Sequence, residues 1–310
     1  MITAIIPCLN EEKSIASTVL EIKKASKLVK EIIVVDNGSS DNTVEVARRA
    51  GAKIIYEPIR GKGYAFRRGL TAVSSNSKLV FLVDGDSTYS VSKIDDAAEL
   101  ILVSGFDMVV GERVDEGEVS KTYRYGHRIG NRALSTLQRL IFSTPIRDSL
   151  SGWRMFSRGF AMSFQGGASS FELEAELNAH AFQLKTSVAN IKVGYRERKF
   201  GSVSKLRTFE DGWRIFRRNL GLWRSERPLR AYTTMSIPWT LLGIFLLARA
   251  LESYVDTGLV PKFPSLIVSV GSFLIASNLW IAGVILERTN LQRTAFARYI
   301  YMQESLKKNS

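Results

Sequence analysis

The sequence predicts an α/β fold with a mainly parallel sheet, followed by a pair of apolar helices long enough to cross a membrane. Strand-like and helical stretches alternate from residue 3 to residue 111, as in sheets whose parallel strands are joined by right-handed crossovers. Polar side chains directly follow several of these strands, at the edge where α/β sheets bind ligands. Two runs without a charged residue, 231–248 and 263–286, come later in the chain.

Short apolar runs place the strands. They cover residues 3–7, 31–35, 53–56, 78–83 and 107–111. Helices are predicted between them, at residues 11–27, from Asp41 to Ala50, within 61–74, and at 93–104. Asn10 and Asp41 stand where N-caps are expected. Beyond residue 113 the pattern is looser, and we expect helices at 129–142 and 171–181 and a strand at 187–193.

The fourth predicted strand ends in Asp84-Gly85-Asp86. Two carboxylates at that point favour a hard-oxygen site for a divalent cation that carries phosphates. Gly85, which has no side chain, leaves the backbone between them free to approach such a ligand. An ordinary Asp-Gly turn is the alternative for this motif alone. Other strand ends also carry polar groups, at Glu11 and Asp36, and in a parallel sheet these ends lie along one edge. The joint pattern predicts that they converge on one ligand.

The distribution of charge favours a membrane surface as partner. The chain has 43 basic and 30 acidic residues, and basic side chains are dense between Arg196 and Arg230. Such a surface can meet nucleic acid, an anionic bilayer or a phosphorylated substrate, and the two apolar runs that follow favour the bilayer over nucleic acid. Because arginines flank the pair of runs on both outer sides, the head and both termini are predicted to be cytoplasmic. A pair of core helices in a soluble domain is the alternative.

These features predict four parts. Residues 1–205 form the α/β head, 206–230 an amphipathic juxtamembrane segment, 231–286 the membrane hairpin and 287–310 a basic cytoplasmic tail. Within the second part, residues 206–222 show apolar side chains separated by arginines, which is typical of a helix on a membrane surface; packing on the head is the alternative. The single cysteine, Cys8, is expected to be a small buried hydrophobic residue.

Several short motifs occur in a fixed order across residues 2–206. They are Ile5-Ile6-Pro7-Cys8-Leu9-Asn10-Glu11, Val34-Val35-Asp36-Asn37-Gly38-Ser39-Ser40-Asp41, Gly61-Lys62-Gly63, Asp84-Gly85-Asp86, Gly111-Glu112-Arg113, Asp148-Ser149-Leu150-Ser151-Gly152-Trp153-Arg154 and Ser204-Lys205-Leu206. In this combination the chain resembles family 2 glycosyltransferases with the GT-A fold, specifically the polyprenyl-phosphate sugar synthases. Those include dolichol-phosphate mannose synthases and bacterial polyprenyl-phosphate glucosyltransferases with a membrane hairpin.

The resemblance implies roles for individual residues. Asp84 and Asp86 would hold the Mg²⁺ or Mn²⁺ that bridges the diphosphate, and Thr88 stands where the mannose synthases have a glutamine ligand. The nucleotide sugar would be bound by residues from several motifs, namely Pro7, Leu9, Glu11, Asp36, Lys62, Asp84, Gly85, Arg113, Arg198 and Lys205. Asp86 and Asp148 would lie at the reaction centre. The spacing of the basic motif differs from the family's at Arg198, whereas Lys205 matches it.

The implied reaction is transfer of a sugar from a nucleotide donor to a polyprenyl phosphate, with inversion at the anomeric carbon. A phosphate monoester is mostly a dianion at pH 7, so a strong general base is less necessary than for a hydroxyl acceptor. Asp148 therefore either acts directly or positions the acceptor loop. We favour a UDP-sugar by overall likeness. A polysaccharide-elongating glycosyltransferase and a non-catalytic nucleotide- or lipid-binding scaffold are the alternatives, and a homo-oligomer is left open.

Overall fold

The structure is a computed structural model that describes residues 1–115, 145–166, 173–196, 220–221, 223–259 and 263–306. The chain divides into two compact units. The first comprises residues 1–218 together with 296–310, and the second comprises residues 219–295.

The first unit is built on a seven-stranded sheet in the order β3-β2-β1-β4-β6-β5-β7. The strands are β1 (Ile2–Cys8), β2 (Val29–Asp36), β3 (Lys53–Tyr56), β4 (Leu79–Leu82), β5 (Met108–Asp115), β6 (Arg154–Ser157) and β7 (Val188–Tyr195). β1, β2, β3 and β4 pair in parallel, as do β5 and β7. β6 runs antiparallel between β4 and β5, so the sheet is mainly parallel with one reversed strand near its centre.

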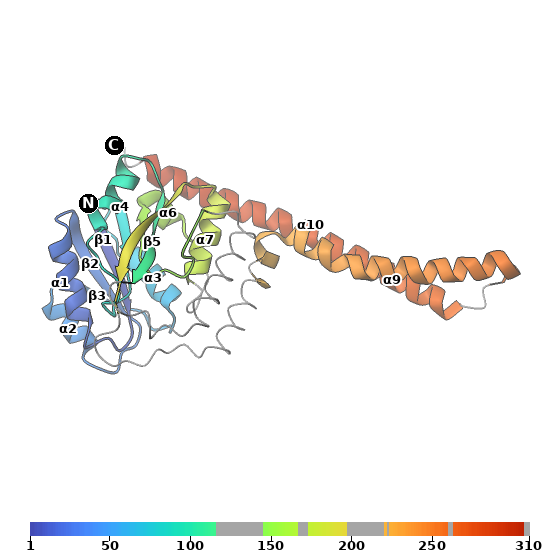
Figure 1. Cartoon of the computed structure of the whole chain (residues 1–310), viewed down its shortest axis with the longest axis horizontal. Coiled ribbons are helices and arrows are strands. Elements are labelled where there is room, and N and C mark those ends of the chain that lie inside the picture. The colour runs from blue at the N-terminus through green and yellow to red at the C-terminus, as the bar shows by residue number, and fades with distance from the viewer. Residues whose placement is uncertain (116–144, 167–172, 197–219, 222, 260–262, 307–310) are drawn as a thin grey trace. The chain divides into compact units, whose positions relative to one another are not determined.

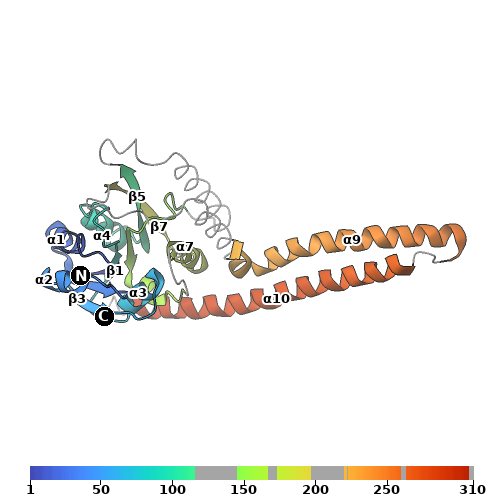
Figure 2. The same ribbon diagram turned by 90° about the horizontal axis from the view of Figure 1, so that it is seen from below.

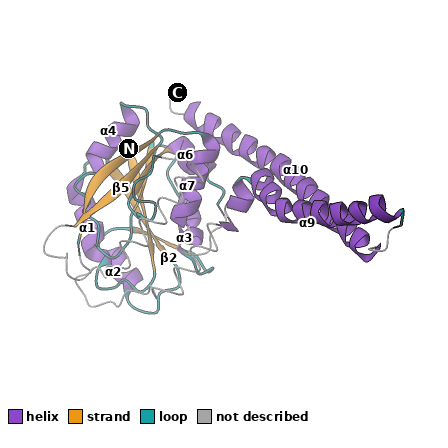
Figure 3. Ribbon diagram, turned by 45° about the vertical axis from the view of Figure 1, so that its right-hand side comes forward, coloured by secondary structure: helices purple, strands orange, loops and turns teal. Residues whose placement is uncertain are grey.

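Helices cover both faces of this sheet (Figures 1 and 3). Buried side chains of α1 (Ile15–Ala25), α2 (Thr43–Arg49) and α4 (Ile94–Leu102) share one core cluster. Those of α3 (Lys62–Leu70), α6 (Arg158–Ser163) and α7 (Leu173–Leu184) share the other. Alternate residues of a strand point to opposite faces, and accordingly Ala4 and Ile6 of β1 belong to the first cluster and Ile5 to the second.

The five strands predicted from apolar runs are present with ends shifted by up to four residues, and the mainly parallel α/β fold is confirmed. The prediction that Asn10 caps the first helix was wrong. That helix begins at Ile15, and Asn10 adopts a φ of 56° while its side-chain oxygen accepts a hydrogen bond from the Ser40 amide at 2.8 Å. The N-cap position of α2 is occupied by Asn42 and not by Asp41 as predicted, although Asp41 accepts a hydrogen bond from the Thr43 amide at 3.0 Å. The predicted helix at 129–142 lies outside the described residues.

The second unit contains two long apolar helices that lie side by side (Figure 2). α9 (Pro228–Thr257) and α10 (Phe263–Leu306) contain windows of mean hydropathy 1.5 and 1.8. Small residues bring them together: Ser269 donates a hydrogen bond to the Gly243 carbonyl at 2.8 Å, and the Phe273 ring packs against Gly243. Such packing is common between membrane helices. Large apolar side chains, such as Leu241 and Phe245, are exposed on the outside, so these helices suggest a membrane anchor.

Both helices are longer than the charge-free runs. α9 continues from the first run through Arg249 and Glu252 to Thr257, within the predicted connector, and ends at Gly258, whose φ of 68° is favourable for glycine. α10 continues through the predicted cytoplasmic tail, and its residues from Phe296 onward belong to the first unit. The boundary predicted between residues 205 and 206 falls outside the described residues.

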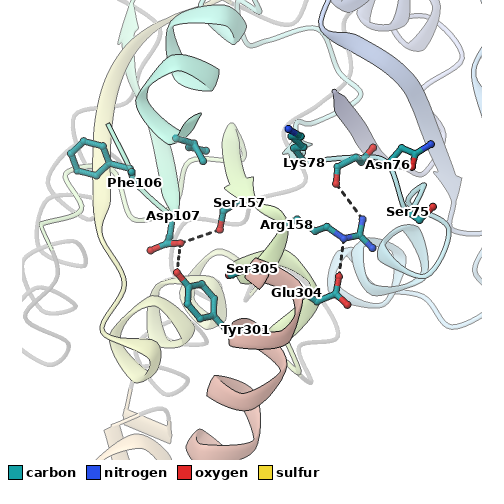
Figure 4. A pocket seen from close by; sticks show the side chains of 14 residues that line it. Ser75, Asn76, Lys78, Phe106, Asp107, Ser157, Arg158, Tyr301, Glu304 and Ser305 are labelled. Carbon is teal, nitrogen blue, oxygen red and sulfur yellow. Dashed lines mark hydrogen bonds and ion pairs between the residues drawn. The ribbon is translucent and has the colours of Figure 1, made fainter. Parts of the chain in front are cut away.

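The C-terminal end of α10 packs at the edge of the sheet that holds the amino end of β4. There the Tyr301 hydroxyl donates to Asp107 at 2.7 Å, and Arg158 forms an ion pair with Glu304 at 2.8 Å (Figure 4). Arg158 also donates to the carbonyls of Ser74 and Ser77. A cavity of about 600 Å³ lies among these side chains. The tail from Phe296 onward is thus part of the α/β unit.

Candidate active site

The predicted site residues gather at the opposite edge of the sheet, where the parallel strands end. Register places Cys8 of β1 beside Asp36 of β2, and Ile5 beside Leu82, so the segment after β4 runs along the end of β1. Because β6 is antiparallel, its first residue, Arg154, pairs with Leu82 and the preceding loop reaches the same edge. The topology therefore brings Asp84, Gly152 and Arg113 together from separate parts of the sequence.

Asp84 is bound by a lysine from the start of α3. The Lys62 ammonium lies 2.5 Å from one oxygen of Asp84 and 2.6 Å from a carboxylate oxygen of Glu174 on α7. The exposed fractions of the three side chains are 17% for Lys62, 29% for Asp84 and 4% for Glu174. Burial lowers the pKa of Lys62, but the two carboxylates outweigh it and raise that pKa well above its ordinary value. Lys62 is therefore a fixed positive charge between two acids.

The Asn37 side chain orients the loop that leads to Lys62. It donates to the carbonyls of Glu57 and Ile59 and accepts from the Gly61 amide at 2.6 Å. Gly61 has a φ of 145°, which favours glycine at this position. The residue after β2 thus fixes the turn from which the Lys62 side chain extends.

A glycine packs directly against the Asp84 carboxylate. A side chain at Gly152 would collide with that carboxylate, so only glycine fits here. The Gly152 amide donates to the Tyr89 hydroxyl at 2.9 Å. Burial raises the pKa of Tyr89 well above its ordinary value, and the phenol stays neutral. The loop before β6 is therefore part of the Asp84 environment.

Asp86 is buried and oriented by Thr88. One oxygen of Asp86 accepts hydrogen bonds from the amide and the hydroxyl of Thr88, at 3.1 and 2.6 Å. The threonine that replaces the expected glutamine ligand thus binds the Asp86 side chain. Between the two carboxylates, a side chain at Gly85 would come within 2.7 Å of the Cys8 sulfur, so packing against β1 accounts for glycine at this position. Cys8 is buried, as expected, and burial raises the pKa of its thiol.

Arg113 and Asp148, which were predicted separately, form a bidentate ion pair. The guanidinium donates to the two Asp148 oxygens at 2.7 and 2.8 Å, and the side chains are 17% and 16% exposed. The Arg113 guanidinium also lies over the Tyr195 ring, 5.4 Å from its centre. Both oxygens of Asp148 accept charge-assisted hydrogen bonds, which fix the orientation of the carboxylate.

A fully buried arginine, Arg154, fixes the loop between Asp148 and β6 by hydrogen bonds. Arg154 donates to the carbonyls of Ser149 and Ser151 at 3.0 Å and to Asn178 at 2.6 Å. Burial lowers the pKa of Arg154 to about 10, so its guanidinium still carries a charge at neutral pH. Arg154 thereby links β6 to α7.

The remaining predicted residues line the ends of β1 and β2 or lie outside the described residues. Pro7 and Leu9 are half-buried, and the Asp36 carboxylate accepts from the Gly38 and Ser39 amides of its own loop. Glu11 accepts a hydrogen bond from Ser14 at 3.0 Å, and its amide donates to Thr43. Arg198 and Lys205 fall outside the described part of the chain.

The donor set of Asp84 and Asp86 fits a divalent cation. Both are hard-oxygen ligands at the carboxyl end of one strand, Asp86 is oriented by Thr88, and Asp84 is partly exposed. Among the described residues no group of three or more His, Cys, Asp or Glu side chains is arranged to hold a metal ion. Mg²⁺ is commonly bound by one or two carboxylates, and substrate phosphates and water complete its shell.

Four residues of this edge were not assigned a role from the sequence. They are Asn37, Tyr89, Glu174 and Arg154. Asn37 and Arg154 lie inside the quoted motifs, and that position was the only available signal for them. Glu174 gave no local signal, because its partner Lys62 lies 112 residues earlier in the chain.

An open, mainly parallel sheet with carboxylates along its carboxyl edge defines a ligand-binding α/β domain. The model of glycosyl transferase family 2 matches residues 3–165, more than half of the chain, and the chain belongs to this family. It is 27% identical to glycosyltransferase AglJ of Haloferax volcanii over 284 residues, covering 90% of each chain. It is also 29% identical to a dolichyl-phosphate hexose transferase of the same organism, over 66% of this chain and 85% of the relative.

Solved structures show the same fold. One is glucosyl-3-phosphoglycerate synthase from Mycobacterium tuberculosis, in complex with Mn²⁺, UDP-glucose and glycerol 3-phosphate. It matches with a TM-score of 0.55 and 24% identity over 73% of this chain and 79% of that one. Another structure of this synthase contains Mg²⁺ and UDP, with a TM-score of 0.55, 24% identity and the same coverage. The α/β unit therefore has the GT-A fold.

Proposed function

We propose that this chain transfers a hexose from a nucleotide sugar, preferably a UDP-sugar, to a polyprenyl phosphate at the cytoplasmic face of a membrane. The observation that carries the proposal is the presence in one chain of a family 2 head with Asp84 and Asp86 at its ligand edge and of two long apolar helices. The similarity to a dolichyl-phosphate hexose transferase and the UDP in the related structures support the acceptor and the donor.

The proposed chemistry follows from charge. An oxygen of the lipid phosphate attacks the anomeric carbon while the bond from that carbon to the nucleotide diphosphate breaks, and the configuration inverts. The acceptor's second pKa is near 6, so it needs little help from a base at neutral pH. When bound at Asp84 and Asp86, Mg²⁺ or Mn²⁺ would neutralise the departing diphosphate. Lys62 and Arg113 would supply further positive charge at this edge.

Asp148 is proposed to act as a positioning residue. Its two oxygens hold the Arg113 guanidinium, and the loop that follows it is fixed by Arg154. Removing Asp148 would leave Arg113 without its bidentate partner. Pro7, Leu9, Glu11 and Asp36, at the ends of β1 and β2, are proposed to receive the nucleoside.

The membrane helices fit the proposed acceptor. A polyprenyl chain leaves a bilayer at a cost of about 0.8 kcal/mol for each methylene exposed to water, so the enzyme has to work at the surface. Arginines lie on both outer sides of the pair of charge-free runs, for example Arg227 before and Arg293 after, and this placement favours a cytoplasmic head. The proposed organisation is thus a head of residues 1–205, a basic juxtamembrane segment to residue 230 and a hairpin of residues 231–286.

Purified full-length protein in vesicles that contain a polyprenyl phosphate tests the proposal. Radiolabelled UDP-glucose, UDP-N-acetylglucosamine and GDP-mannose are offered separately with Mg²⁺ or Mn²⁺, and the lipid fraction is extracted. We expect label in the lipid with one donor, dependent on the added cation and absent from vesicles without polyprenyl phosphate.

The matched control is Asp86→Asn, which keeps the size of the side chain and removes its charge. It should leave the lipid unlabelled. Lipid without label under every donor would overturn the proposed acceptor, whereas label in a long water-soluble polymer would favour polysaccharide elongation instead.

A further inference from the structure

Lys62 occupies the position where a cation is expected. Its ammonium lies 2.5 Å from an oxygen of Asp84, so a metal ion bound to the same carboxylate would lie close to this positive charge and be repelled by it. The Asp84 carboxylate also packs directly against Gly152. Its side chain therefore has little room to turn away from Lys62. An incoming metal ion must therefore compete with Lys62 for Asp84.

Glu174 provides the alternative partner for the lysine. Its carboxylate lies 2.6 Å from the same ammonium and is almost fully buried, on a helix that Asn178 and Arg154 tie to β6. Removal of Lys62 would leave that carboxylate buried without its partner, which is strongly unfavourable. When the Lys62 ammonium moves away from Asp84, it still keeps its buried ion pair with Glu174.

We infer that Lys62 is a built-in substitute for the metal ion: it neutralises Asp84 when the site is empty, and cation binding moves its ammonium off Asp84 while Glu174 retains it. The inference deepens the proposed function and rests on it, because it takes Asp84 as a metal ligand. Glu174 is then a positioning residue, because its attraction for the ammonium sets the free energy needed to move Lys62 off Asp84. This movement of Lys62 would keep Asp84 neutralised between turnovers. It would also leave a positive charge near the diphosphate once the metal is bound.

The test measures Mn²⁺ binding without turnover. Full-length protein in detergent, without nucleotide, is titrated with Mn²⁺, and free Mn²⁺ is counted by electron paramagnetic resonance. Lys62→Met removes the competing ammonium and should lower the Mn²⁺ dissociation constant by about tenfold. Glu174→Gln leaves Asp84 as the only one of the two carboxylates that attracts the Lys62 ammonium. It should raise the Mn²⁺ dissociation constant by about tenfold. Lys53→Met, which breaks the ion pair with Glu31 at 3.0 Å, is the matched control and should change nothing.

The double variant Lys62→Met with Glu174→Gln separates competition from net charge. It has the formal charge of the wild type and leaves no unpaired buried carboxylate, so it also serves if Lys62→Met alone folds poorly. Competition predicts that it binds Mn²⁺ more tightly than the wild type, whereas a net-charge effect predicts equal affinity.

The outcomes distinguish this inference from the function it rests on. Weaker or unchanged Mn²⁺ binding in the double variant, beside normal binding in the wild type, would overturn the inference and leave the metal assignment standing. Failure of the wild type to bind Mn²⁺, with or without UDP, would overturn both.

Discussion

The two edges of the sheet carry ion pairs of similar burial in different settings. At the carboxyl edge, Arg113 and Asp148 are 17% and 16% exposed, and at the amino edge Arg158 and Glu304 are 17% and 13% exposed. Arg158 is also fixed by the carbonyls of Ser74 and Ser77, and its partner lies on the end of α10. Lys62, by contrast, contacts two carboxylates at once, those of Asp84 and Glu174. Burial alone therefore does not distinguish the two edges; the difference is that Lys62 at the carboxyl edge contacts a second carboxylate.

The comparison predicts that charge removal at the carboxyl edge affects turnover more than folding. Asp86→Asn should lower turnover with the lipid acceptor by about 10³-fold, because it removes an anionic metal ligand, with little change in the melting temperature. Lipid-extracted product and scanning fluorimetry measure the two effects. Asp96→Asn, which removes an exposed carboxylate on α4, is the control and should leave both unchanged. Wild-type turnover in Asp86→Asn would refute the metal site.

A methyl group placed beside Asp84 should have the next largest effect. Gly152→Ala forces the Asp84 carboxylate to move, and a displacement of about 1 Å at a reacting centre can cost about 10²-fold in rate. The kcat/KM for lipid glycosylation is the measurement. Gly271→Ala on α10 is the control, since a β-carbon there has open space around it. Equal activity of the two variants would mean that the position of Asp84 is unimportant.

At the amino edge, the order of the effects should reverse. Arg158→Met removes the ion pair with Glu304 and two hydrogen bonds to backbone carbonyls, which should destabilise the α/β unit by about 1–3 kcal/mol. We expect a lower melting temperature and unchanged kcat/KM at temperatures well below it. Lys53→Met breaks a more exposed pair and should cost less than about 1 kcal/mol. A loss of turnover in folded Arg158→Met would show that this edge takes part in function.

How far the sequence alone predicts this molecule depends on the range of the interactions. Apolar runs identified the five strands because burial on both faces leaves a local pattern. β6 was not predicted, since it is four residues long and begins with Arg154, a charge that is satisfied by carbonyls and by Asn178 on a different helix. Motifs identified Arg113 and Asp148 separately, but their pairing depends on how β5 and β6 meet.

The same limit applies to Glu174 and to the tail. The burial of Glu174 becomes visible only when α7 packs on the sheet beside Lys62. The end of α10 was predicted only as a basic cytoplasmic tail, because its contacts are made by Tyr301 and Glu304, with partners well over one hundred residues away. Local patterns thus predicted the elements, and tertiary contacts decided which charges meet.

The smallest predicted effect concerns the pH dependence of stability at the amino edge. Burial, together with the neighbouring Asp107 carboxylate, raises the pKa of Tyr301 to about 12. The folded protein therefore keeps this proton above pH 10, near which an unfolded tyrosine loses it. The stability it contributes is complete below pH 10 and is lost as the pH rises towards 12. Tyr301→Phe should thus show a shallower fall in melting temperature over this interval. Tyr299→Phe, at an exposed tyrosine on the same helix, should follow the wild type, and parallel profiles for all three proteins would contradict the linkage between Tyr301 and Asp107.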